Sequence, residues 1–253
     1  MTNYWKNAEV LAREKLLDIS IDKLEALIKN AYLKQSDRIL KDLLEVYETI
    51  LRENETPLKS HLYQFNRYYD MLNKIQSRLN ELGVYENLLF NEKLEELYIN
   101  NQKIIDATYG LQSNIRTELV EETIKKVWVD DGLRFSDRIW KDKAALMEKL
   151  QEVMVDSVGS GKSIDRLTAE LMEKFSVSYN EAKRLVRTEM AHTAIQSTID
   201  KYKDAGVTRY RLLSEPDCCE ECSGLKEEVF PIDDTEHLPP EHPNCRCSIL
   251  AVW

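Results

Sequence analysis

Apolar residues recur at three- and four-residue intervals through the first part of the chain. One stripe contains Leu40, Leu43, Leu44, Tyr47, Ile50 and Leu51, and another contains Leu94, Leu97, Tyr98, Ile104 and Ile105. This spacing places each set on one helix face and predicts amphipathic helices. Pro57 separates two of these helices, and Gly83 predicts another turn. We expect several long helices across residues 3–155, packed as a bundle or an extended arm.

The helical pattern resumes after a predicted loop at residues 156–163. The apolar face of the next helix carries Ile164, Leu167, Leu171 and Phe175. Ser178 and Glu181 have the spacing of a capping box, in which each side chain bonds a free backbone N–H. This spacing predicts that a further helix starts there, runs to about Asp204 and ends at Gly206.

The chain changes character near residue 206. Only Pro57 precedes that point, whereas five prolines follow it: Pro216, Pro231, Pro239, Pro240 and Pro243. All five cysteines also lie beyond it. Residues 207–213 and 248–252 are rich in β-branched and large apolar side chains, which predicts two strands among loops.

These patterns predict a mainly α protein with two domains. Residues 1–155 would form the helical arm or bundle, and residues 156–253 a C-terminal domain that ends in a small α+β module at 206–253. The 253 residues include only 7 glycines and 6 prolines, which is typical of a helix-rich soluble chain. No apolar run approaches the roughly 20 residues that cross a bilayer, so we expect no membrane partner and a cytoplasmic protein.

The net charge of -10 argues against nonspecific DNA binding by the whole protein, because phosphate attraction needs a basic face. A local basic strip is the alternative. It would consist of Lys183, Arg184, Arg187, Lys201, Lys203, Arg209 and Arg211. We treat Arg184 and Arg187 as possible contacts to nucleic acid, and a solvated helix face as the simpler interpretation.

The segment Gly159–Ser163 ends in Gly-Lys-Ser, as a nucleotide-binding loop does. Such a loop has another glycine five positions before its Gly-Lys pair, but here that position is Asp156. The preceding residues also have a helical pattern, whereas the motif should follow a strand. We therefore interpret the segment as a turn between helices, with Ser163 as the N-cap.

Cysteine and histidine spacing in the last part predicts a metal centre. Cys219 and Cys222 form a Cys-x2-Cys pair, and His242, Cys245 and Cys247 follow about twenty residues later. Two short turns of this kind supply the four ligands of tetrahedral zinc. Cys219 and Cys222 are the firmest pair, and the sequence leaves open which two of the other three residues complete the set. We regard the adjacent Cys218 as a spare thiol.

Zinc would also explain how residues 207–253 fold. This segment is short and rich in loops, so its apolar burial would barely offset the entropy of ordering it. Four protein ligands leave no open coordination position, which predicts a structural zinc and no catalysis. The alternatives are disulfides, which reducing conditions disfavour, and free thiols.

Glu189 lies on the apolar stripe of its helix, together with Ala182, Val186 and Thr193. A buried carboxylate is costly unless it is paired or hydrogen-bonded. We therefore expect a partner from outside the helix, and Arg246, between two candidate ligands, is our candidate. A role for Glu189 as a general base is the alternative.

Three motifs in this order resemble the phage minor head protein family that includes the Mu F protein and the SPP1 head morphogenesis protein. They are Arg-Leu-Val-Arg-Thr-Glu at 184–189, Asp217 with Cys-Glu-Glu-Cys-Ser-Gly-Leu at 219–225, and His-Pro-Asn-Cys-Arg-Cys at 242–247. The resemblance extends from about Lys141 to Trp253.

The resemblance implies a bacteriophage virion component present in few copies, in the head interior or portal region, and in the host cytoplasm during assembly. It implies association with the portal protein and a role in head morphogenesis or DNA ejection. The major capsid or scaffolding protein and the packaged DNA are further possible partners. We expect such a minor capsid protein to have no enzymatic activity.

Two other functions remain as alternatives. One is a zinc-supported nuclease of the HNH kind, in which His237 or His242 would activate water. The Pro239-Pro240 pair opposes it, because it breaks the helix that this site needs. The other is a DNA-binding zinc module that uses the basic strip.

Overall fold

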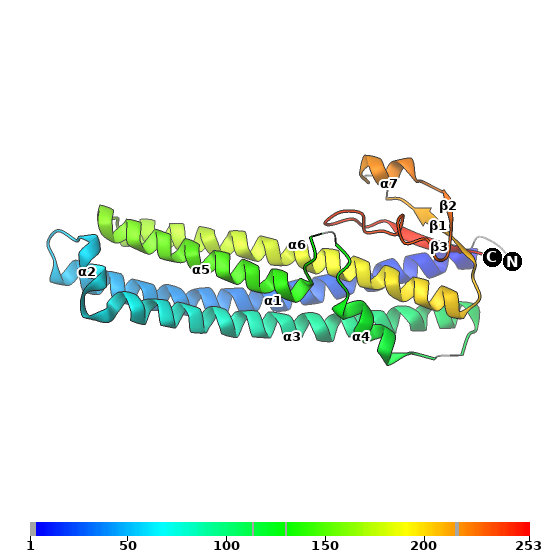
Figure 1. The fold of residues 1–253 in the computed structure, drawn as a ribbon, viewed down its shortest axis with the longest axis horizontal. Helices are drawn as coiled ribbons and strands as arrows, with labels where there is room; N and C mark the ends of the chain where they lie inside the picture. Colours follow the sequence, from blue (N-terminus) through cyan, green and yellow to red (C-terminus); the bar gives the residue numbers. More distant parts are fainter. Residues whose placement is uncertain (1–3, 113, 130, 216–217) are drawn as a thin grey trace. The chain divides into compact units, whose positions relative to one another are not determined.

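The computed structural model describes residues 4–112, 114–129, 131–215 and 218–253 (Figure 1). Its long helices are α1 (Tyr4–Glu53), α3 (Arg67–Tyr109), α5 (Phe135–Ser160) and α6 (Ile164–Asp204). Its shorter helical elements are α2 (Lys59–Tyr63), the 3-10 turn η1 (Gln64–Asn66), α4 (Thr117–Lys125) and α7 (Glu220–Gly224). The predicted mainly α class is confirmed. None of the described helices has the length and apolar character to cross a membrane.

The C-terminal module contains an antiparallel sheet of three strands. They are β1 (Arg209–Leu213), β2 (Val229–Pro231) and β3 (Ser248–Val252), in the order β2-β1-β3. Tyr210 in the central strand pairs with Phe230 on one side and Ala251 on the other. Both predicted strands are confirmed. No pattern along the chain predicted β2, which is three residues long and ends in a proline, as only an edge strand tolerates.

The chain forms two compact units. Unit 1 comprises Met1–Glu25, Leu89–Arg134 and Arg184–Trp253, and unit 2 comprises Ala26–Leu88 and Phe135–Lys183. These units follow tertiary contacts, whereas the domains expected from the sequence, 1–155 and 156–253, follow the chain. That division stays a prediction.

Unit 2 has a core formed by the apolar faces of its helices. The predicted stripe is buried there, with Leu43, Tyr47 and Ile50 fully inaccessible. The expected turn at Gly83 was wrong, because this glycine lies inside α3. A Cβ at Gly83 would lie 2.6 Å from Cζ3 of Trp140, so the missing side chain serves close helix packing.

Two predicted helix boundaries in unit 2 also need correction. The expected loop at 156–163 is shorter, because α5 continues to Ser160. Ser163 does act as the N-cap, since its Oγ accepts a bond from the backbone N–H of Arg166 at 3.3 Å. Ser178 starts no helix: it lies inside α6, and its hydroxyl donates to Asp142 Oδ2 at 2.6 Å. The polar spacing that suggested a cap instead serves a contact between helices.

Unit 1 holds the sheet against helices through buried polar and aromatic side chains. Arg13 on α1 donates to the carbonyl oxygen of Ile249 on β3 at 2.7 Å. Glu9 on α1 accepts a bond from the Tyr202 hydroxyl on α6 at 2.6 Å. The last residue of α6 is Asp204, and Gly206, with φ +77, terminates the helix as predicted. The N–H of the next residue, Val207, bonds the Tyr202 carbonyl at 2.9 Å. The C-terminal module thus follows directly from the fixed end of α6.

Candidate metal centre

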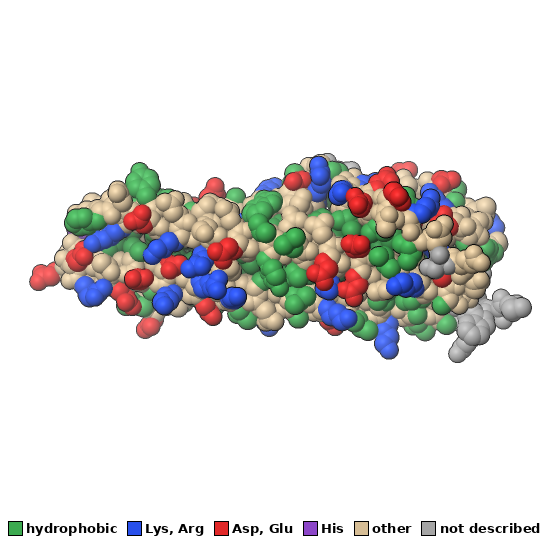
Figure 2. All heavy atoms as spheres, turned by 90° about the horizontal axis from the view of Figure 1, so that it is seen from below, with side chains coloured by type: hydrophobic (Ala, Val, Ile, Leu, Met, Phe, Trp, Pro, Cys, Tyr) green, Lys and Arg blue, Asp and Glu red, His purple; other side chains and the backbone are tan. Residues whose placement is uncertain are grey.

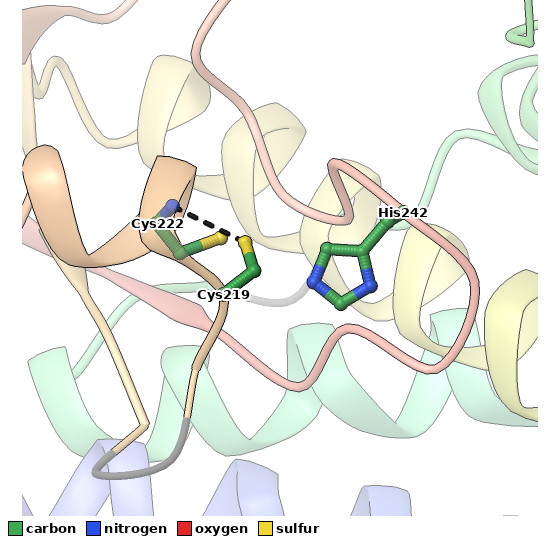
Figure 3. Close-up of side chains that lie close together, drawn as sticks. All are labelled: Cys219, Cys222 and His242. Atoms are coloured by element: carbon green, nitrogen blue, oxygen red, sulfur yellow. Dashed lines mark hydrogen bonds between the residues drawn. The ribbon is translucent and has the colours of Figure 1, made fainter.

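The short helix α7 places two cysteine sulfurs together. Cys219 is its N-cap, and the backbone N–H of Cys222 donates to Cys219 Sγ at 3.3 Å, drawn as a dashed line in Figure 3. The free N–H groups at a helix start favour an acceptor, and the Cys219 sulfur fills that role here. The Cys222 side chain is fully buried.

The turn from His242 to Cys245 faces this helix. The N–H of Cys245 donates to the His242 carbonyl at 3.1 Å, and Asn244 takes the left-handed conformation at φ +64. His242 Nδ1 lies 2.9 Å from the carbonyl oxygen of Pro243, to which it donates. Donation from Nδ1 leaves the lone pair of Nε2 available for a metal. In Figure 3 the imidazole lies across from the sulfurs of Cys219 and Cys222.

The donor atoms form two groups that share one residue. Those of Cys219, Cys222 and His242 lie within 4.8 Å of one another, and so do those of Cys222, Cys245 and Cys247. The sulfurs of Cys222 and Cys245 are 3.9 Å apart. Tetrahedral zinc with Zn–S bonds of about 2.3 Å separates its sulfur ligands by roughly 3.8 Å. The cluster therefore fits a metal ion of this kind.

All five cysteines are free thiols, and Cys218 belongs to neither group found among the described residues. It packs half-buried beside the cluster. The structure thus contains no disulfide among these cysteines.

The protonation of the thiols depends on their neighbours. A hydrogen bond from Cys247 lowers the pKa of Cys245 to about 5, and the pKa of Cys247 is raised in return. Burial raises the pKa of Cys222 to about 12. Protons on some of the sulfurs keep these closely packed atoms from all being negative. A divalent cation that displaced those protons would hold the cluster together more strongly.

Hydrogen bonds and an ion pair connect the cluster to the rest of unit 1. The N–H of Asn244 donates to Thr188 Oγ1 on α6 at 3.3 Å. Ser214, just after β1, donates to the carbonyl of Cys222 at 2.6 Å. Arg246 pairs with Asp18 on α1. The two turns are therefore anchored to three different elements.

The predicted pair between Glu189 and Arg246 does not occur among the described contacts, because Arg246 pairs with Asp18 instead. Glu189 is buried, as expected, and accepts a bond from the indole Nε1 of Trp128 at 3.1 Å. The same indole stacks on His192, with ring centroids 4.2 Å apart. Trp128 was not predicted as this partner, although the indole N–H is a donor that can satisfy a buried carboxylate.

The predicted basic strip is largely neutralised by acidic partners. The pairs are Lys201 with Asp106 at 2.5 Å, Lys203 with Asp233 at 2.8 Å, Arg187 with Glu25 at 2.7 Å and Arg211 with Glu227 at 3.3 Å. Lys201 is also buried, whereas Arg184 is exposed. Figure 2 shows acidic and basic side chains mixed over the face that it draws. Four of the seven residues of the strip therefore have an acidic partner.

His237 has a structural environment of its own. Its Nδ1 lies 3.2 Å from both carboxylate oxygens of Asp234, and its ring stacks on Phe230 at 4.6 Å between centroids. It belongs to neither donor group of the part of the chain that the structure describes. Asp217, part of one motif of the resemblance, lies outside the described residues.

Residues 148–250 match the family model described as phage Mu protein F like protein. This part of the chain is Mu F-like. The family resemblance expected from the sequence is thereby confirmed over these residues. The Mu F-like region contains both halves of the cysteine and histidine cluster, as well as Glu189. Comparisons with curated proteins and with solved structures gave no match.

Proposed function

We propose that this chain is a minor head protein of a tailed bacteriophage or prophage that associates with the portal. It would act in head morphogenesis or in genome delivery, in the head interior or portal region of the virion. The observation that carries the proposal is the Mu F-like match over residues 148–250, which includes the ordered cysteine and histidine motifs.

We further propose that the cluster binds one structural zinc ion. Cys219 and Cys222 would be joined by two of His242, Cys245 and Cys247, so that all four positions are filled by the protein. A zinc without an open position has nowhere to activate water. Its contribution is to fix two turns of a loop-rich module, and the protein would have no enzymatic activity of its own.

Binding to the portal tests the proposed function most directly. Purified full-length chain would be incubated with the portal oligomer of the same phage or prophage, and the complex isolated by gel filtration. We expect co-elution that excess untagged chain competes away. The matched control is a portal oligomer from an unrelated phage, and the major capsid and scaffolding proteins are tested in parallel. Binding to none of the three cognate proteins would refute the proposal.

The nuclease alternative would use His237 or His242 to activate water, and His237 is engaged with Asp234 and Phe230. We expect no nicking of supercoiled plasmid in the presence of Mg²⁺ or Mn²⁺. Cleavage that is lost in both His237→Ala and His242→Ala variants would establish the enzyme instead.

The DNA-binding alternative requires cations that are free to meet phosphate. Most of the predicted strip is paired with carboxylates, so we expect no salt-dependent shift of DNA mobility at physiological ionic strength. A shift that Arg184→Ala weakens would favour that alternative.

A further inference from the structure

The two donor groups of the cluster offer five atoms to an ion that takes four. Cys222 belongs to both groups, so any single centre must include it. Cys219 and His242 form one group with it, and Cys245 and Cys247 form the other. One residue of the second pair must therefore lie outside the coordination sphere if both members of the first pair bind.

We infer that the ligands are Cys219, Cys222, His242 and Cys245, and that Cys247 stays outside as a sulfur that hydrogen-bonds Cys245. This inference rests on the zinc centre of the proposed function and goes beyond it by choosing the ligands. Three observations lead to it: the position of each residue relative to the strand, the orientation of the imidazole, and the charge around the site.

The position of the strand separates Cys245 from Cys247. Cys245 belongs to the turn that begins at His242, through its N–H bond to the His242 carbonyl, so both can move toward the metal together. Its sulfur already lies 3.9 Å from Cys222 Sγ. Cys247 directly precedes β3, where Ser248 pairs with Leu213 of β1. Drawing Cys247 toward Cys219 and His242 would pull on that register.

The orientation of His242 argues that it binds. Its Nδ1 donates to Pro243, which fixes the tautomer and leaves Nε2 as an acceptor. The imidazole faces the sulfurs of Cys219 and Cys222 and groups with them within 4.8 Å (Figure 3). An imidazole that only faced solvent would need neither the fixed tautomer nor the position facing the sulfurs.

Charge favours the set with the histidine. Zinc with three thiolates and one neutral imidazole carries a net charge of -1, whereas four thiolates would give -2. Glu220 and Glu221 begin α7, and Glu241 precedes His242, so the surroundings are already acidic. The nearby Arg246 is paired with Asp18. The less negative centre is therefore the more stable one here.

Cobalt substitution of the reduced full-length protein tests the ligand set, because the intensity of the thiolate-to-cobalt charge-transfer band reports how many thiolates bind. We expect one Co²⁺ per chain, with the intensity of three thiolates. Cys247→Ser should keep the stoichiometry and intensity, and weaken the affinity by no more than about 10- to 100-fold, as an outer-sphere change does. Cys245→Ser should lower the band by the intensity of one thiolate, or should lose the metal.

His242→Cys supplies a gain of signal that does not depend on a destabilised variant. If His242 is a ligand, the new thiolate raises the intensity of the charge-transfer band from that of three thiolates to that of four. If Cys247 is the fourth ligand instead, His242→Cys leaves the band unchanged and Cys247→Ser lowers it, which overturns the inference. Cys218→Ser is the matched control and should behave as the wild type does. Wild-type protein that takes up no Co²⁺ or Zn²⁺ would refute the proposed zinc centre as well.

Discussion

Lys143 Nζ lies 2.7 Å from Glu86 Oε2, and both side chains are buried in unit 2. The same ammonium group lies 2.9 Å from Asp142 Oδ2, so one cation serves two carboxylates. The Tyr32 hydroxyl on α1 and the Ser178 hydroxyl on α6 complete the cluster with bonds to Asp142. Four helices thus meet at one polar layer inside an otherwise apolar core.

Lys143→Met should destabilise the protein strongly, because it leaves the buried Glu86 and the half-buried Asp142 without a cation. Breaking a buried pair in this way costs about 3–5 kcal/mol. Glu86→Gln should cost less, since Asp142 still compensates the ammonium charge. Urea denaturation followed by circular dichroism measures both. An equal loss in the two variants would contradict the idea that Lys143 balances the layer.

Acid sensitivity should depend on His192. Burial lowers the pKa of this imidazole from 6.5 to about 3, because the folded protein holds it neutral against Trp128. The unfolded chain binds the proton more tightly, so stability is lost as pH falls from 6.5 towards 3. The slope from this group is at most about 1.4 kcal/mol per pH unit.

His192→Phe keeps an aromatic ring against Trp128 and removes the titrating group. We expect the free energy of unfolding of this variant to depend less on pH between 6.5 and 4 than that of the wild type. Urea unfolding across that range measures the difference, with a variant at the half-buried His61, His61→Gln, as control. Identical pH profiles for His192→Phe and wild type would refute the prediction.

Metal removal should loosen the module and spare the long helices. Strong chelator would remove the ion that joins the two turns, and residues 214–252 have little apolar burial of their own beyond the sheet. Hydrogen exchange followed by mass spectrometry should show faster exchange in α7 and in the turn at His242, and no change in α5. Added zinc should restore the slow exchange. Equal protection with and without chelator would show that the module needs no ion.

Arg246 should matter little to stability despite its position between two cysteines. Its pair with Asp18 is half exposed on both sides, and such surface pairs contribute about 0–1 kcal/mol. Arg246→Ala and Asp18→Ala should therefore have similar, small effects on urea midpoints and none on metal stoichiometry. Thr188→Val serves as the comparison for Arg246→Ala, because it removes the acceptor for the Asn244 N–H. A large loss from Arg246→Ala alone would point to a second partner.

Local periodicity predicted much of the fold because it reports a single helix face. The stripe at Leu43, Tyr47 and Ile50 is buried as its spacing required. Glycine and serine were less informative, since their small size serves both turns and close packing. Gly83 accommodates the Trp140 ring and Ser178 bonds Asp142, and neither purpose is visible from spacing along one helix.

The sequence by itself determined the long helices, two of the three described strands and the set of sulfur and imidazole side chains, because residue type and spacing decide these locally. Only the tertiary structure decided the partners of the buried charges. Glu189 meets Trp128, Arg246 meets Asp18 and Lys201 meets Asp106, each across a separation along the chain that no local pattern encodes. Burial imposes the need for a partner, but packing alone selects which one is near enough to satisfy it.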